Sequence, residues 1–142
     1  MLNALTASAE ITVPFHDLDP VEIVWHGNYV RYLEVARDEL MNRIAYSHAE
    51  MRASGFFWPV VEMKLRYLRA ARLRQVLRVR ASISEFEHRL KIVYDISDSA
   101  SGRRLTRAHT VQVAVRIDNG EMLFQTPPVL REKIAAAAAL AR

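Results

Sequence analysis

The sequence predicts an α+β domain: an antiparallel sheet of about five strands wraps around one long helix, and a C-terminal helix follows. Apolar residues recur at helical spacing in the first third of the chain, and they alternate with polar residues in four later runs. An apolar helix stripe and an apolar sheet face are both buried when the sheet curves around the helix. The 142 residues suit the single domain, residues 1–142, that we expect.

The predicted elements begin with a short strand at residues 10–15. A helix then runs to about residue 45, with Asn28 as its expected N-cap. Strict alternation predicts four consecutive antiparallel strands, at residues 61–67, 77–84, 90–97 and 110–117. The alanine-rich residues 130–140 predict the terminal helix.

The composition excludes several classes of function. The chain has no cysteine, which excludes disulfides, thiolate nucleophiles and cysteine-bound zinc. It has four glycines and no glycine-rich phosphate loop, so we do not expect nucleotide binding of that kind. No apolar run is long enough to cross a bilayer, and no basic residue precedes the short apolar N-terminus. We therefore expect a cytoplasmic protein without a membrane span.

Arginine supplies most of the net charge of +4, and it gathers in two regions. The two groups are Arg66, Arg69, Arg72, Arg74, Arg78 and Arg80, followed by Arg103, Arg104 and Arg107. Most of these side chains are expected to form a solvated face. The alternative is a docking surface for the phosphates of coenzyme A or for an acidic carrier protein. Nucleic acid is not an expected partner, because no nucleic-acid-binding module is recognisable.

The loop before the long helix holds the candidate chemistry. Asp17 and Asp19 lie two residues apart, so in an extended segment both carboxylates point the same way. Pro20 stiffens the chain after Asp19, and the apolar residues 23–25 would partly desolvate that carboxylate. This favours a functional Asp19, whereas Asp17 stays open between a structural and a functional role.

His26 and Gly27 stand at the expected start of the helix. The histidine could contact substrate, carry a proton, stabilise an oxyanion through its backbone N–H, or simply end the loop. Gly27 would let a substrate approach the backbone closely. No metal site is predicted, because the histidines and aspartates of the loop match no helix-borne ligand spacing.

The motif F-x-D-x-D-P-x-x-I-V-W-H-x-N-Y at residues 15–29, followed by Y-L-E-x-A-R at residues 32–37, resembles the hotdog-fold acyl-CoA thioesterases. The similarity is greatest to the 4-hydroxybenzoyl-CoA thioesterase family, which includes the short acyl-CoA thioesterases associated with the Tol-Pal system. The chain departs from that family at Ala70, where proline is common, and at Gln75, where an acidic residue is frequent. The resemblance implies a homodimer whose sheets join edge to edge, sites at the subunit interface, and further pairing into a tetramer.

The resemblance also implies roles for the loop residues. Asp19 matches the catalytic carboxylate, which acts as a nucleophile or as a general base on water. His26 occupies the position of a tyrosine or histidine at the helix start. Backbone N–H groups near His26, Gly27 and Asn28 would polarise the thioester carbonyl.

Three further residues match positions that bind substrate in the family. Glu34 corresponds to an acidic position that lines the acyl pocket of aromatic-specific members. Arg89 and Lys91 are the expected contacts of the coenzyme A phosphates, although Glu87 interrupts the basic run. The structural alternative for Arg89 and Lys91 is a solvated strand edge.

The predicted function is hydrolysis of acyl-CoA to a free acid and coenzyme A without a metal or bound cofactor, since the coenzyme A moiety is part of the substrate. The alternatives are hydrolysis of acyl groups on an acyl carrier protein, a non-catalytic acyl-thioester-binding module, and a hydratase of the same architecture. The sequence leaves the acyl group undefined.

Overall fold

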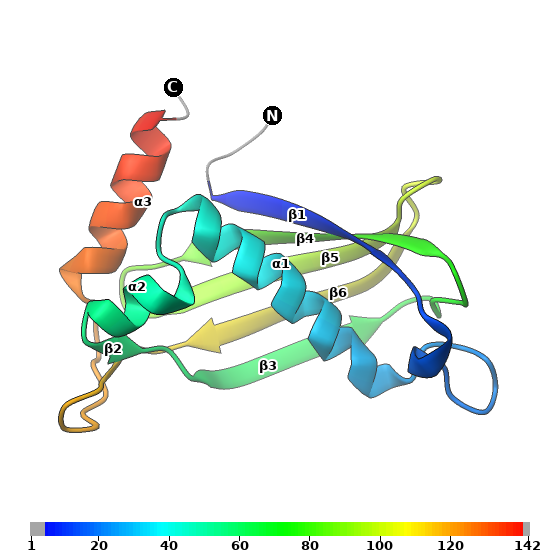
Figure 1. The fold of residues 1–142 in the computed structure, drawn as a ribbon, viewed down its shortest axis with the longest axis horizontal. Helices are drawn as coiled ribbons and strands as arrows, with labels where there is room; N and C mark the ends of the chain where they lie inside the picture. The colour runs from blue at the N-terminus through cyan, green and yellow to red at the C-terminus, as the bar shows by residue number, and fades with distance from the viewer. Residues whose placement is uncertain (1–4, 141–142) are drawn as a thin grey trace.

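The computed structural model describes residues 5–140 (Figure 1). Its main sheet is antiparallel, with the strand order β1-β4-β5-β6-β3. The strands of this sheet are β1 (Thr6–Thr12), β3 (Val60–Tyr67), β4 (Val76–Glu85), β5 (Leu90–Asp98) and β6 (Arg104–Gln112). A two-stranded sheet pairs β2 (Phe56–Phe57) with β7 (Val115–Arg116). The helices are α1 (Tyr29–Arg43), α2 (His48–Ala53) and α3 (Pro128–Leu140).

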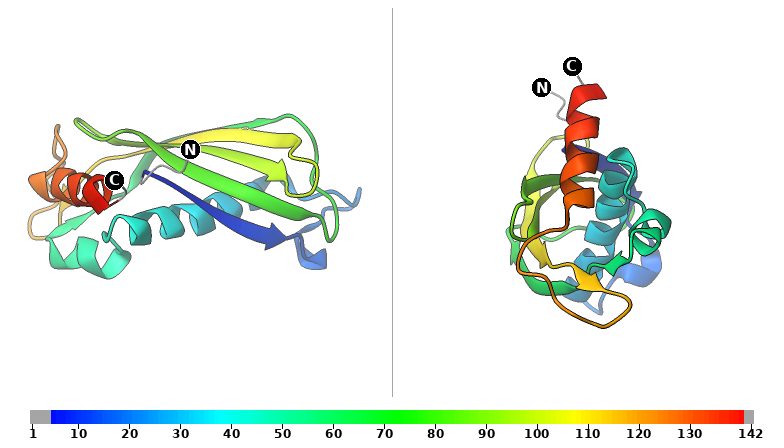
Figure 2. Two further views of the ribbon diagram at one scale, coloured as in Figure 1. Left: turned by 90° about the horizontal axis from the view of Figure 1, so that it is seen from above. Right: turned by 90° about the vertical axis from the view of Figure 1, so that its left-hand side faces the viewer.

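Helix α1 lies across the concave face of the main sheet, as the sequence predicted (Figures 1 and 2). Its stripe of Tyr32, Leu33, Ala36 and Leu40 is buried, and it packs mainly against β1 and β4. The inward residues of β4 and β5 alternate as expected and are also buried: Leu77, Val79, Ala81, Ile83, Leu90, Ile92, Tyr94 and Ile96. Burial of these two apolar surfaces is the main force that holds the fold together.

The opposite face of the sheet is polar, and no helix among residues 5–140 lies over it (Figure 2). The strand register places one row of outward side chains across all five strands: Ser8, Arg80, Asp95, Arg107 and Arg66. Lys64 and His109 form part of the next row. No helix of the described residues is long and apolar enough to span a bilayer.

Two element boundaries differ from the prediction. Strand β1 covers Thr6–Thr12 rather than residues 10–15, because Pro14 has no N–H for a ladder and precedes a 3-10 turn. Helix α2 was not predicted. The hydroxyl of Ser47 accepts the N–H of Glu50 at 3.4 Å, so this helix begins with a capping box that the sequence S-x-x-E already contains.

The prediction for the last strand was wrong in its bounds and in its inward face. Strand β6 is Arg104–Gln112, and the chain then leaves the main sheet so that Val115 and Arg116 pair with β2. Thr110 faces the core, where its hydroxyl lies 3.0 Å from that of Tyr94. Gln112 shares that face and is buried, although the pattern suggested an exposed position.

Candidate active site

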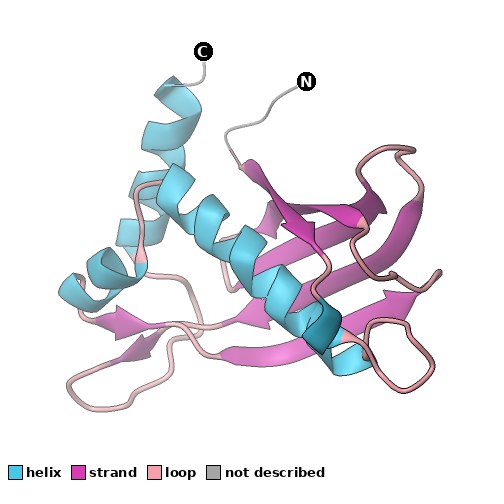
Figure 3. Cartoon of the chain, turned by 45° about the vertical axis from the view of Figure 1, so that its right-hand side comes forward, coloured by secondary structure: helices cyan, strands magenta, loops and turns pink. Residues whose placement is uncertain are grey.

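The loop between β1 and α1 is a tight hairpin fixed to the β3–β4 connection (Figure 3). Leu18 and Val24 form an antiparallel bridge, and the N–H of Asp19 donates to the carbonyl of Ile23 at 2.8 Å. The N–H of Val24 donates to the carbonyl of Ala71 at 2.9 Å. Both sides of the hairpin are therefore held before any substrate arrives.

Asp19 is half-buried, and the hairpin fixes one of its two oxygens. Its Oδ1 accepts the N–H of Val21 at 2.9 Å and that of Ile23 at 3.4 Å, whereas no donor among residues 5–140 binds Oδ2. Asp19 lines a cavity of about 570 Å³ between the hairpin and the β3–β4 connection, and no residue of α1 is among its lining residues. The other lining residues are Phe15, His16, Leu18, Val21, Glu22, Arg72 and Leu73. The carboxylate is thus oriented and still has a free oxygen.

Two observations connect this hairpin to the start of α1. Burial raises the pKa of Tyr29, the first residue of the helix, and the nearby charge of Asp19 adds to the rise. The Tyr29 hydroxyl accepts the N–H of Ala71 at 3.0 Å, which holds the helix start against the β3–β4 connection. Glu22, at the tip, has a φ of 67°, so the turn places a side chain in the left-handed region that glycine adopts more readily.

Asp17 makes structural contacts, which favour the structural side of the alternative that the sequence left open. It is only 3% exposed, and its Oδ2 accepts the hydroxyl of Tyr32 at 2.6 Å. Arg31 lies 3.6 Å from its Oδ1. The backbone carbonyl of Asp17 accepts the N–H of Trp25 at 3.0 Å and the side-chain amide of Asn28 at 2.8 Å. Asp17 therefore joins the beginning of the loop to its end and to the first turn of α1.

Burial of Tyr32, together with its contact with Asp17, makes stability depend on pH in the alkaline range. Burial, followed by the hydrogen bond to Asp17, raises the pKa of Tyr32 well above its ordinary value of 10.0. The folded protein therefore keeps this proton after the unfolded chain has lost it, and stability falls as the pH rises above 10.0. Urea unfolding between about pH 9 and about pH 11 should show a shallower decline for Tyr32→Phe than for the wild type. Equal slopes would contradict this.

Trp25 and Gly27 are matched to each other at the start of the helix. A Cβ atom at Gly27 would overlap the six-membered ring of Trp25, so the glycine lets the indole lie over the backbone. The His26 ring is exposed, with its centroid 5.0 Å from that of Trp25. The His26 carbonyl accepts the hydroxyl of Tyr67 at 2.9 Å. The indole and the Tyr67 phenol thus flank His26.

Gly27→Ala should move the Trp25 indole away from the helix start, because the added methyl group and the ring cannot share the same space. Trp25 is 49% exposed and has room to turn outward, so we expect a change in its fluorescence with only a small loss of thermal stability. The spectrum should be compared in a Trp58→Phe background, which leaves Trp25 as the single tryptophan. An unchanged spectrum would show that the indole does not depend on the glycine.

The predicted backbone donors are not equivalent. The N–H of Asn28 already donates to the carbonyl of Trp25 at 2.9 Å in a 3-10 turn, His26–Asn28. Asn28 precedes α1 as expected, but its side chain caps no helix N–H because it binds the carbonyl of Asp17. No acceptor within residues 5–140 binds the N–H of His26 or of Gly27.

Glu34 lines a second cavity, of about 400 Å³, between α1, α2 and β2. It forms an ion pair with Arg37 in the same cavity. The apolar lining residues are Met41, Met51, Phe56, Phe57, Trp58 and Ile117. Two buried polar atoms there have no hydrogen-bond partner within the described chain: Nη1 of Arg37 and Oε1 of Gln112. Gln112 could not be predicted at this site, because strand alternation placed it on the exposed face.

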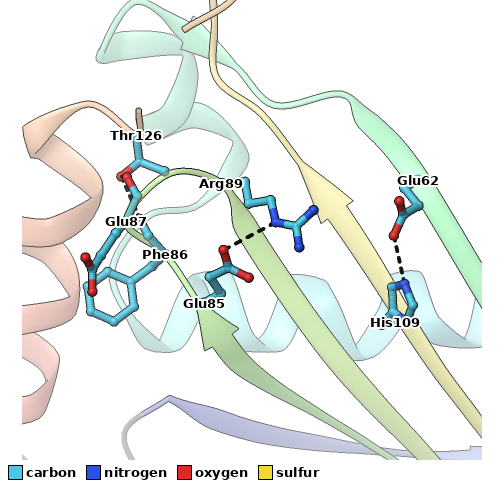
Figure 4. A network of polar contacts seen from close by, with 7 residues as sticks. All are labelled: Glu62, Glu85, Phe86, Glu87, Arg89, His109 and Thr126. Atoms are coloured by element: carbon cyan, nitrogen blue, oxygen red, sulfur yellow. Dashed lines mark hydrogen bonds and ion pairs between the residues drawn. The ribbon is translucent and has the colours of Figure 1, made fainter. Parts of the chain in front are cut away.

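Arg89 and Lys91 lie at the opposite end of the sheet from Asp19. Arg89 follows the β4–β5 turn and pairs with Glu85 at 3.3 Å (Figure 4). Lys91 stands opposite Val111 and near Glu62, whose pKa is lowered first by its hydrogen bond from His109. Within one chain the structure therefore separates Asp19 from Arg89 and Lys91. Residues 5–140 contain no group of three or more acidic or histidine side chains placed to hold a metal ion.

Comparison with known proteins identifies the family. The sequence matches the thioesterase-like superfamily over residues 13–137. The putative esterase sll0410 of Synechocystis is 31% identical over 125 residues, which cover 87% of this chain and 75% of that protein. The acyl-CoA thioester hydrolase YbgC of Escherichia coli is 25% identical over 126 residues, covering 89% of this chain and 90% of that protein.

Comparison with solved structures shows the fold. The crystal structure of Slr0204, a 1,4-dihydroxy-2-naphthoyl-CoA thioesterase from Synechocystis, superposes with a TM-score of 0.80 at 22% identity. The match covers 92% of this chain and 96% of that one. Both the predicted fold and the predicted family are therefore confirmed. This chain belongs to the thioesterase-like superfamily and has the hotdog fold.

Proposed function

We propose that this thioesterase hydrolyses acyl-CoA to a free acid and coenzyme A, with Asp19 as the reacting carboxylate. The observation that carries the proposal is the different hydrogen bonding of the two oxygens of that carboxylate. The hairpin fixes Oδ1, and no donor within residues 5–140 binds Oδ2, which lies beside a cavity. A carboxylate that is oriented and half-desolvated is suited to attack a carbonyl or to take a proton from water.

Both routes can be written with this one side chain. As a nucleophile, Asp19 forms a bond to the thioester carbon, the thiolate of coenzyme A leaves, and water then hydrolyses the mixed anhydride. As a general base, it takes a proton from the water that attacks the carbonyl, and the proton is passed on to the leaving thiolate. In both routes negative charge develops on the carbonyl oxygen. The N–H groups of His26 and Gly27, which bind no acceptor within residues 5–140, are the proposed donors that stabilise it. Neither route needs a metal or bound cofactor.

A homodimer joined through β3 would complete the site. Strand β3 is an edge strand, and it exposes the apolar residues Val60, Val61 and Tyr67. The Asp19 loop is attached near its C-terminal end, where Tyr67 binds His26. The Glu34 cavity lies near its N-terminal end, where Gln112 donates to the carbonyl of Trp58 at 2.7 Å.

Antiparallel pairing of two β3 strands places the C-terminal end of one beside the N-terminal end of the other. The Asp19 of each subunit then approaches the apolar cavity of its partner, which would hold the acyl group. The same pairing brings Glu34, Arg89 and Lys91 toward the site from the second subunit. Pairing of dimers into a tetramer and a cytoplasmic location stay predictions of the sequence.

A thiol-release assay with aromatic, short-chain, medium-chain and long-chain acyl-CoAs tests the function and finds the preferred acyl group. We expect one class to be hydrolysed well above the background rate. Saturable acyl-CoA binding without release of thiol from any substrate would contradict hydrolysis and favour the non-catalytic binding module.

A further inference from the structure

Six exposed arginines gather at the end of the sheet that carries Asp19. They are Arg66, Arg69, Arg72, Arg74, Arg103 and Arg107. They come from the ends of β3 and β6 and from the β3–β4 and β5–β6 connections, which lie together at one end of the molecule (Figure 1). We call this surface the arginine end. No side chain of the six forms an ion pair or hydrogen bond within residues 5–140.

Within residues 5–140 no acidic side chain lies within ion-pair distance of the arginine end. Arg66 and Arg107 stand directly opposite each other on neighbouring strands, an arrangement of like charges that destabilises a sheet. Of the nearby acids, Asp19 and Glu22 line the same cavity as Arg72, whereas Asp95 and Asp98 are engaged elsewhere. Asp95 binds Arg104 at 2.9 Å, and Asp98 accepts the side-chain amide of Gln75 and the N–H of Ser101. These hydrogen bonds lower the pKa of Asp98. An anion from outside the chain would remove the repulsion.

Exposed apolar side chains lie among these arginines. Phe15 is 78% exposed, Leu68 is 47% exposed and Leu73 is 42% exposed. Phe15 and Leu73 also line the Asp19 cavity, together with Arg72. Phosphate groups alone need the charges but not the apolar surface. A protein surface with acidic side chains around apolar ones complements both features.

We propose that the arginine end docks an acidic acyl carrier protein, which presents its acyl thioester to Asp19 on a phosphopantetheine arm. This inference rests on the proposed function, because the same carboxylate hydrolyses the thioester. Arginine suits the role, since its planar guanidinium binds carboxylates through two hydrogen bonds. The opposite end of the sheet has a smaller excess, because Arg89 is paired with Glu85 there and only Lys91 beside it forms no ion pair within the described residues.

The test compares one acyl group on two carriers, coenzyme A and a purified acidic acyl carrier protein. The variant Arg69→Ser/Arg103→Ser removes two charges that lie outside the Asp19 cavity. We expect it to lower kcat/KM about tenfold on the carrier protein, mainly through KM, and less than twofold on acyl-CoA. The control Arg43→Ser/Arg131→Ser removes the same charge from the far end of the molecule and should change neither value by more than twofold.

Two results would overturn the proposal. An equal loss on both substrates would assign the arginine end to the phosphates of coenzyme A, and an unchanged kcat/KM on the carrier protein would show that these charges do not take part. Binding of the acylated carrier protein to Asp19→Asn gives a readout that does not depend on turnover, and Arg69→Ser/Arg103→Ser should weaken it about tenfold. If the wild type hydrolyses neither substrate, the proposed function fails, and this binding measurement still tests the docking surface.

Discussion

Replacing Asp19 by asparagine is expected to lower kcat about a thousandfold on every acyl thioester that the wild type hydrolyses. The amide can still accept the N–H groups of Val21 and Ile23 through its oxygen, so the hairpin keeps its shape. It cannot act as a nucleophile or take a proton from water. Because the same donors remain bound, the free energy of unfolding should change by less than about 0.5 kcal/mol. Steady-state thiol release and urea unfolding measure the two quantities.

The control for this variant is Asp118→Asn, which makes the same chemical change in an exposed turn. It should leave kcat and stability within error of the wild type. A kcat for Asp19→Asn within tenfold of the wild type would exclude the carboxylate as the reacting group, whatever the position of the loop. A large loss of stability would instead show that asparagine disturbs the hairpin, and the kinetic result would then need Asp19→Ser as a second variant.

The spacing of apolar residues was sufficient to predict the elements that form the core of the fold. The stripe of α1 and the alternation of β4 and β5 were predicted because each buries one face along its whole length. The inward face of β6 was not predicted correctly, because polar residues occupy both faces of this strand. Thr110 points inward to Tyr94, and buried Gln112 binds the carbonyl of Trp58. A buried polar side chain with a partner distant in the sequence looks the same in the sequence as an exposed one.

The site was only partly predictable for the same reason. Position in a short motif singled out Asp19, but the role of Asp17 depends on Tyr32, fifteen residues later on the helix. The sequence also could not show that Glu34, Arg89 and Lys91 lie away from Asp19 within one chain. Strand direction fixes that separation within one chain, and the homodimer that we propose would close it. Residues that share a substrate site need not be neighbours in their own chain.

The largest loss of stability is expected from Asp17→Ala. The substitution leaves the hydroxyl of Tyr32 buried without an acceptor and removes the counter-charge of Arg31. Removing one partner from a buried, charged hydrogen-bonded pair typically costs about 3 kcal/mol, because the other partner stays desolvated. We therefore expect urea unfolding to show a fall of about 3 kcal/mol. Activity should decline as well, since the same residue holds the loop that carries Asp19.

A double-mutant cycle with Tyr32→Phe tests whether the two side chains act as a pair. Asp17→Ala/Tyr32→Phe has neither the unpaired hydroxyl nor the unpaired carboxylate, so it should lose at least about 1 kcal/mol less than the sum of the single variants. If the losses in free energy of unfolding are additive, the hydrogen bond between the two side chains does not contribute to stability. Comparing these variants with Asp19→Asn also distinguishes the roles of the two aspartates in this short motif. Loss of Asp17 should lower stability and, through the loop, turnover. Loss of the Asp19 carboxylate should lower turnover alone, because only Asp17 is buried against a partner.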